Sequence, residues 1–185
     1  PQDMPITRFA VSAIDGVSPA REYFVTQISS FGETDLLCYR SEQGELADRQ
    51  AELWQPILDW AADKLKISLF TASGIVPVQQ GVDSVYAMRS AVDGHNNMEL
   101  AALHSITTVT GSLILALAVS ASEIDAESAW ELSQLDEAWQ AERWGDPVWP
   151  AHLRAHLGGG SGPGPRSGSG RRGLPGPQDP APPRR

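Results

Sequence analysis

The sequence contains little cysteine, few basic residues outside its last part, and no long apolar run. Cys38 is the one cysteine in 185 residues, which excludes an intramolecular disulfide and fits a reducing compartment such as the cytosol. The longest apolar stretch, LILALAVSA at 113–121, is about half as long as the roughly 18–20 residues that a membrane-spanning helix needs. We therefore expect no membrane span and interpret this stretch as a core helix.

The two ends of the chain differ from its middle. The amino end lacks the charged, apolar and small-residue succession of a signal peptide, and it begins with Pro1 rather than Met, so we expect a fragment with upstream sequence missing. From Gly158 the sequence is rich in Gly, Pro, Ser and Arg and almost free of large apolar side chains. Such a composition cannot offset the entropy of ordering the chain. We therefore expect one folded domain over 1–157 and a disordered tail over 158–185.

The charge is strongly acidic in the part that we expect to fold. Of the 14 basic and 23 acidic residues, five arginines and one aspartate lie from residue 158 onward, which leaves 9 basic and 22 acidic side chains in 1–157. A surface of that sign repels phosphate backbones and anionic lipid. We therefore expect a protein partner of neutral or basic surface and no nucleic acid.

The spacing of apolar residues predicts a mainly α fold. Apolar side chains recur every three or four positions in most of the chain, and we expect helices over 6–17, 18–32, 45–66, 82–93, 98–122 and 125–145. Pro56 predicts a kink or a break near Gln55, and Gly111 suggests that a neighbouring helix approaches closely there. The segment 34–40 is a strand or a buried connector, and 67–81 is extended or looped.

The last expected helix carries two apolar stripes. Winding 129–144 at about 100° per residue places one sector against the core, made of Ala129, Leu132, Leu135 and Trp139. A second sector contains Trp130, Glu137 and Trp144. Either neighbouring helices of the same domain cover this sector, with Glu137 accepting a hydrogen bond there, or the sector binds a partner, as indoles around a charge often do. Residue types alone leave both interpretations open.

The sequence shows no catalytic or metal-binding motif. The four histidines lack the spacing and the Cys or Glu partners of a zinc site; they are His95, His104, His152 and His156. No dinucleotide or phosphate-binding glycine motif occurs, and no Ser, Thr or Cys has a recognisable nucleophile setting. We interpret His104 as a hydrogen-bonded core residue and Cys38 as a buried apolar one. We expect no enzyme activity, cofactor or metal.

Five blocks of the sequence, in order and spacing, resemble one family. That family is the ATP12-type chaperone family, which includes the mitochondrial ATP synthase assembly factor two and its α-proteobacterial relatives. The resemblance covers roughly residues 4–149. The blocks are TDLLCYR (34–40), RQAELWQPILDWA (49–61), GIVPVQQ (74–80), LAALHSITTVTGSLILALAV (100–119) and AWELSQLDEAWQAERWG (129–145).

The resemblance implies a fold and a function. Members have a small β-rich amino-terminal domain and a mainly helical orthogonal bundle, and this chain would hold the bundle and lack most of the first domain. They bind the unassembled α subunit of the F-type ATP synthase catalytic sector and shield it until a β subunit replaces them, without hydrolysing nucleotide. The expected location is the bacterial cytoplasm, or the mitochondrial matrix in eukaryotic relatives, and we expect a monomer.

The resemblance also implies where the client binds. The family has an acidic position in the LDE motif of its last helix, which falls here on Asp136 or Glu137, and the choice between them stays open. We expect Trp130, Glu137 and Trp144 as contacts, with Asp136 and Gln140 beside them. Two alternatives remain, an uncharacterised enzyme with acidic cleft residues and a truncated, non-functional product.

Overall fold

The computed structural model describes residues 12–74 and 77–144. The chain divides into two units, Pro1–Pro147 and Val148–Arg185, and the second lies wholly outside the described residues. The expected domain boundary at 157, the expected tail and two of the histidines lie outside them as well. All the structural features described belong to the first unit, which is helical.

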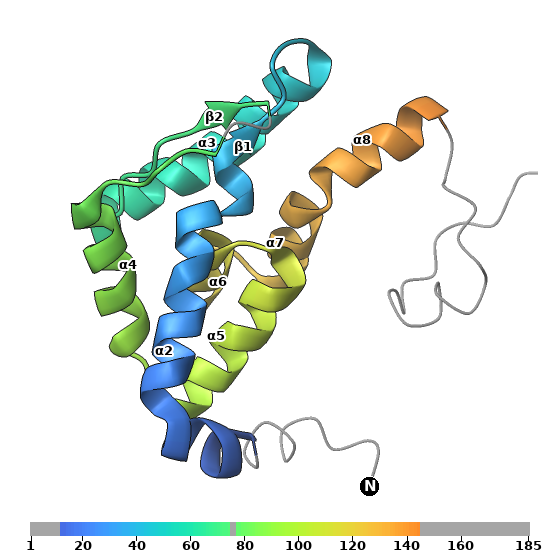
Figure 1. The fold of residues 1–185 in the computed structure, drawn as a ribbon. Helices are drawn as coiled ribbons and strands as arrows, with labels where there is room; N and C mark the ends of the chain where they lie inside the picture. Colours follow the sequence, from blue (N-terminus) through green and yellow to red (C-terminus); the bar gives the residue numbers. More distant parts are fainter. Residues whose placement is uncertain (1–11, 75–76, 145–185) are drawn as a thin grey trace, which may run out of the picture. The chain divides into compact units, whose positions relative to one another are not determined.

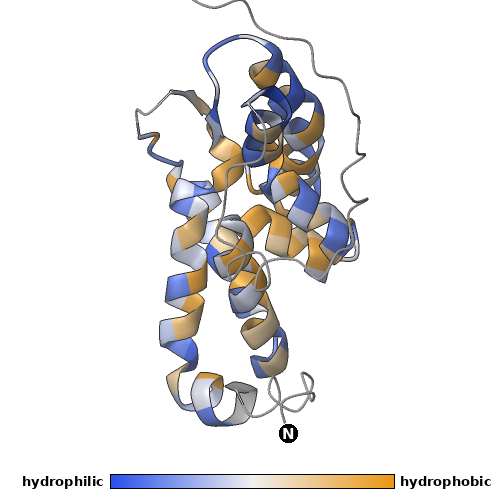
Figure 2. Cartoon of the chain, turned by 90° about the vertical axis from the view of Figure 1, so that its right-hand side faces the viewer, coloured by the Kyte–Doolittle hydropathy of each residue, from blue (hydrophilic) through white to orange (hydrophobic). Residues whose placement is uncertain are grey.

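The described part of the chain is mainly α-helical, as predicted (Figure 1). Its α-helices are α2 Arg21–Ser30, α3 Glu45–Trp60, α4 Val82–Asp93, α5 Asn97–Thr110, α6 Leu113–Ser120, α7 Ala126–Ser133 and α8 Leu135–Trp144. Two short π-helical segments accompany these helices, Ser12–Val17 before α2 and Ala61–Leu65 directly after α3, and a 3-10 turn, Ser18–Ala20, leads into α2. Apolar and hydrophilic residues alternate along most of the helices (Figure 2), which is the pattern of helices that share a core.

The extended segments form one very short sheet. Strand β1 Tyr39–Arg40 pairs in parallel with β2 Ala72–Ser73, so that two stretches far apart in the sequence lie side by side. A short helical turn, Leu36–Cys38, leads into β1. The expected short β segment is therefore present, and the block 34–40 is both connector and strand.

Helix α6 lies at the centre of the core and confirms the expected core helix. Six consecutive residues, Leu113–Ala118, are buried. It packs against α5, α7 and α3. A helix that is apolar on every side has to be covered on every side, so this segment sets the positions of its neighbours.

The single helix expected over 98–122 is wrong, because the chain turns at Gly111. This residue adopts a left-handed conformation with φ of 69°, which ends α5, and the Ser112 side chain caps the start of α6 by accepting from the Leu115 N–H at 3.0 Å. No atom lies within 4 Å of the place where a Gly111 Cβ would stand. The residue is glycine because of its backbone conformation, so the close helix approach that we expected there is also wrong.

Of the kink or break expected near Gln55, the break is absent. Helix α3 runs without interruption from Glu45 to Trp60 with Pro56 inside it. Proline removes the hydrogen bond to the carbonyl four residues earlier, which belongs to Glu52. Both Glu52 and Pro56 are exposed, so water can satisfy that carbonyl and the helix continues.

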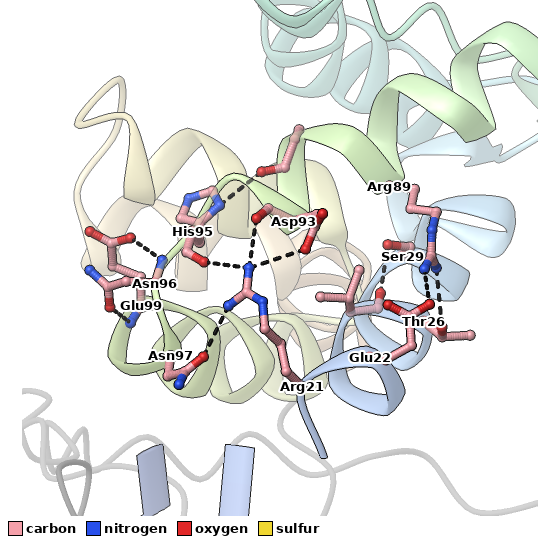
Figure 3. Close-up of polar contacts among 12 residues, drawn as sticks. Arg21, Glu22, Thr26, Ser29, Arg89, Asp93, His95, Asn96, Asn97 and Glu99 are labelled. Carbon is pink, nitrogen blue, oxygen red and sulfur yellow. Dashed lines mark hydrogen bonds and ion pairs between the residues drawn. The ribbon is translucent and has the colours of Figure 1, made fainter. Parts of the chain in front are cut away.

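A single arginine joins the start of α2 to the loop between α4 and α5 (Figure 3). Arg21 donates to the Asn97 side chain at 3.0 Å and to the carbonyl oxygens of Asp93 at 2.7 Å and His95 at 2.9 Å. The planar guanidinium group suits several oxygens at fixed angles. These hydrogen bonds hold the α4–α5 turn against the start of α2. They therefore fix the ends of α4 and α5 that meet in this turn relative to α2.

Candidate functional site

The last helix of the sequence is in fact two helices. Helix α7 ends at Ser133 and α8 begins at Leu135, with Gln134 between them at φ −98° and ψ 11°. The Gln134 N–H donates to the carbonyl oxygens of Trp130 and Glu131, at 3.1 and 3.2 Å. The uniform winding that placed Trp130 and Trp144 in one sector is therefore wrong, because the two side chains belong to different helices.

Both of these indoles are accessible to solvent. Trp144 is 70% exposed and Trp130 is 36% exposed. Trp144 packs edge-on against Trp139, with ring centroids 5.4 Å apart, and the Arg143 guanidinium lies 5.2 Å from the Trp139 ring. Trp139, which we expected in the core sector, thus joins the Trp144 cluster at the surface. The interpretation in which neighbouring helices fully cover Trp130 and Trp144 does not describe this structure.

The two candidate acids of the LDE motif have different surroundings. Asp136 is half-buried and accepts from the Gln50 side chain at 2.8 Å, and Gln50 in turn accepts from the Ser41 N–H at 2.7 Å. Asp136 therefore takes part in holding α8 to α3. Glu137 is exposed, and no hydrogen bond or ion pair joins it to another described residue.

Exposed ion pairs complete the attachment of α8 to α3. Arg49 on α3 lies 2.8 Å from Glu142, and Glu45 on α3 lies 3.3 Å from Arg143. Leu135 is the one buried residue that α8 contributes. Since exposed pairs of this kind each contribute about 0–1 kcal/mol, α8 is held loosely in energetic terms. Gln140 lies on the same helix and is exposed.

Trp130 borders an apolar pocket rather than the α8 surface. The pocket has a volume of about 250 Å³ and lies between α5 and α7. Its lining residues are Ser105, Ile106, Val109, Thr110, Ala126, Ala129 and Trp130. The candidate residues therefore form two separate surfaces, one around Trp144 and Glu137 and one around Trp130.

Sequence reasoning missed Asp35, which is fully buried beside α6. Its carboxylate accepts from the Ser112 hydroxyl at 2.7 Å, the Ile114 N–H at 3.0 Å and the Leu37 N–H at 3.1 Å. Burial raises the pKa of Asp35 from 3.8 to about 6, and the hydrogen bonds partly oppose that rise. The available signal in the sequence was its position directly before the apolar residues 36–38. Its contacts suit a structural role at the start of α6.

The remaining polar candidates also have structural surroundings. Burial raises the pKa of the Cys38 thiol to about 12, which makes it unreactive at neutral pH. His104 packs edge-on against Phe24, with centroids 5.4 Å apart. His95 lies 2.8 Å from the Ser120 hydroxyl and 2.9 Å from the Ala91 carbonyl. Within 12–74 and 77–144, no three His, Cys, Asp or Glu residues gather in a way that could hold a metal.

The indole of Trp54 has a structural role. Trp54 is fully buried and donates from its ring N–H to the Leu132 carbonyl at 2.9 Å, which joins α3 to α7. Among the described helices none has the length and apolar character needed to cross a bilayer. The described unit is thus a helical domain that displays the indoles of Trp130 and Trp144 at its surface.

Comparison with known proteins identifies the family. The model of the ATP12 chaperone protein family matches residues 1–62. Protein atp12, mitochondrial, of Schizosaccharomyces pombe is 28% identical over 153 residues, which cover 77% of this chain and 53% of that protein. With the fold and the surface described above, these likenesses and those to solved structures show that the chain belongs to the ATP12 chaperone family.

The solved structures agree with that assignment. Atp12 from Paracoccus denitrificans is 43% identical with a TM-score of 0.76, over 78% of this chain and 62% of that one, and a mutant of the same protein matches equally. A protein from Agrobacterium tumefaciens is 38% identical with a TM-score of 0.76, over 82% of this chain and 57% of that one. The chain thus spans between 53% and 62% of the length of these relatives.

Proposed function

We propose that this chain acts in the assembly of F-type ATP synthase, as a chaperone that binds the unassembled α subunit until a β subunit replaces it. The observation that carries the proposal is the likeness to Paracoccus Atp12, at 43% identity over 78% of this chain. The names of the relatives describe a chaperone family, which supports a binding role without catalysis. One relative is named as mitochondrial and others are bacterial, so we place the chain in a bacterial cytoplasm or a mitochondrial matrix, as a monomer.

The α8 surface is the proposed contact with the client. It consists of Glu137, Gln140 and Trp144, all of which are exposed. An exposed indole supplies a large apolar contact area, and a carboxylate beside it selects a basic side chain on the partner. The affinity should be moderate, since a β subunit has to displace the chaperone.

Glu137 is the better candidate than Asp136 for the acid that meets the client. The carboxylate of Asp136 already binds Gln50, so a substitution there disturbs the attachment of α8 to α3. Glu137 is exposed and can meet a partner without losing a contact within the domain. A substitution at Glu137 therefore reports on binding, and one at Asp136 reports on both binding and structure.

The test is protection of purified α subunit from aggregation by the full chain. We expect an equimolar amount of the chain to keep the α subunit in the supernatant after centrifugation. Glu137→Lys should lose most of that protection, because it places a cation against a basic surface, and Trp144→Ala should weaken it. Circular dichroism should show both variants folded.

Asp83→Lys is the matched control for the charge reversal. Asp83 is also an exposed acid on a helix, but it lies on α4, which contributes nothing to the α8 surface. This variant should protect the client as well as the unsubstituted chain does. If Glu137→Lys protects equally well, the α8 surface is not the contact, and if the unsubstituted chain gives no protection, the proposed function itself is wrong.

A further inference from the structure

The pocket between α5 and α7 is open and apolar. Two of its walls are exposed side chains, Val109 on α5 at 62% and Trp130 on α7 at 36%. The helices α5 and α7 contact each other in the described domain. Large apolar side chains that line a hollow and remain exposed often mark an interaction site. We call this hollow the Trp130 groove.

Carboxylates lie on α7 and in the turn before it, next in sequence to the residues that line the groove. Glu127 lies one helical turn before Trp130 and Glu131 directly after it, and both are exposed. Glu123 and Asp125 lie in the turn before α7 and are exposed too. None of these four carboxylates has an ion pair with another described residue, whereas Glu142 on α8 pairs with an arginine of α3.

The negative charge of these carboxylates determines which kind of partner the groove can bind. An apolar hollow whose adjoining helix carries exposed carboxylates without ion pairs attracts a segment in which a large apolar side chain lies between lysines or arginines. A second copy of the chain would bring like charges together across a twofold interface, which costs free energy. Nucleic acid and anionic lipid are repelled for the same reason.

The volume of the groove also favours a protein side chain as the occupant. Its volume of about 250 Å³ lies below the range of roughly 300–1,000 Å³ typical of small-molecule sites. It can hold one large aliphatic or aromatic side chain. A single anchor that fills a hollow is how many protein interfaces concentrate their binding energy.

We infer that the Trp130 groove is a second docking site, separate from the α8 surface, for a basic amphipathic segment of a partner protein whose apolar anchor enters between Val109 and Trp130. The inference rests on the proposed function only in naming the α subunit as the source of that segment. Two sites on one client would add to its affinity without either contact being strong. A weak contact at each site is compatible with displacement by a β subunit.

The direct test uses a synthetic peptide and the full chain. The probe is a short fluorescein-labelled helical peptide with leucines on one face and lysines on both sides of them, and binding is followed by fluorescence anisotropy. Val109→Gln should weaken binding by about tenfold, as expected for loss of an apolar anchor contact. Because Val109 is mostly exposed, this variant should fold. Trp130→Ala should weaken binding at least as much.

The matched controls separate the groove from the general charge of the chain. Val82→Gln alters another exposed valine, on α4, and should leave peptide binding unchanged. The double variant Glu127→Gln and Glu131→Gln should weaken binding and reduce its dependence on salt. Asp83→Asn, which removes an acid from α4, should do neither. A peptide with glutamine in place of leucine should bind much more weakly than the leucine peptide.

Three results would overturn the inference. Equal binding of the peptide by the Val109→Gln variant would show that the groove is not the site. Equal binding of the glutamine peptide would show adhesion by charge alone. A chain that sediments as a dimer, and becomes a monomer with Val109→Gln, would make a second copy the occupant.

The outcome is distinguishable from that of the proposed function. If the chain binds the peptide in the groove but gives no protection to the α subunit, the docking site stands and the proposed function fails. If Val109→Gln abolishes peptide binding and still protects the α subunit fully, the groove does not serve that client. Loss of both with Val109→Gln, and of neither with Val82→Gln, supports the inference in full.

Discussion

Helices α6 and α8 are similar in length, but they differ in how many of their residues are buried in the core. Six consecutive residues of α6, Leu113–Ala118, are buried, whereas α8 buries Leu135 alone. Burial of one large apolar side chain contributes roughly 1.5–3 kcal/mol, but an exposed ion pair contributes about 0–1 kcal/mol. The centre of the domain is therefore fixed by packing, and its last helix by a few contacts at the surface.

This difference has a functional meaning. An element with few buried contacts opens and adjusts at low cost in free energy, and its polar side chains remain available to a partner. The α8 surface could therefore adapt to the client that we propose, while α6 keeps the rest of the domain unchanged. Perturbing the surroundings of each helix tests how far the two differ, and the larger effects are expected near α6.

The largest effect is the pH dependence that Asp35 gives to the α6 end of the core. Its pKa is about 6 in the folded chain, against an ordinary value of 3.8. Between these values the unfolded chain releases the proton first, so stability falls as the pH rises from about 4 through about 6, by roughly 3 kcal/mol in total. Below pH 4 both states hold the proton and the full stability is present.

The check is chemical denaturation of the unsubstituted chain and of Asp35→Asn across pH 4 to about 7. The unsubstituted chain should lose stability relative to the variant in that interval, because asparagine cannot ionise, and the difference should become constant above it. Should the variant fail to fold, carbon NMR of the Asp35 carboxyl in the unsubstituted chain gives its pKa directly. A value near 4 by that measurement would contradict the prediction.

A smaller effect is expected at Gly32, where the turn after α2 meets α6. A Cβ there would lie 2.0 Å from the Met88 sulfur and 3.1 Å from a Leu113 methyl carbon. Both side chains are fully buried, so Gly32→Ala should lower the free energy of unfolding by about 1–3 kcal/mol through overpacking. The same change at Gly16, where a Cβ meets nothing within 4 Å, is the control. Equal stability of both variants would show that this part of the core can adjust.

Much of this architecture was predictable from the sequence because it depends on local patterns. The apolar run at 113–121 required burial, and α6 has it. The last expected helix begins at Asp125, a residue type that favours helix starts, and its carboxylate accepts from the Ser128 N–H at 2.7 Å. Caps and apolar spacing act over a few residues, so a short stretch of sequence contains the whole interaction.

The errors have a common physical origin in contacts between distant residues. Periodicity continues across Gly111 and Gln134 because apolar residues follow both, so the turns at these positions were missed. Asp35 meets Ser112 across a separation of 77 residues, and no local pattern reports such a pair. The separation of Trp130 from Trp144 was missed for the same reason, since it results from the turn at Gln134.

The smallest effect is expected at Glu45, which holds both Arg49 and Arg143 and so joins α8 to α3. Glu45→Ala should lower the free energy of unfolding by less than about 1 kcal/mol, because the pairs are exposed. It should nevertheless speed hydrogen exchange at the amides of α8, since that helix has few other contacts, and leave exchange in α6 unchanged. If the variant is instead destabilised as much as Gly32→Ala, the energy that holds α8 is comparable to that of the core. The α8 surface would then be rigid, and its adjustment to a client could not depend on local opening.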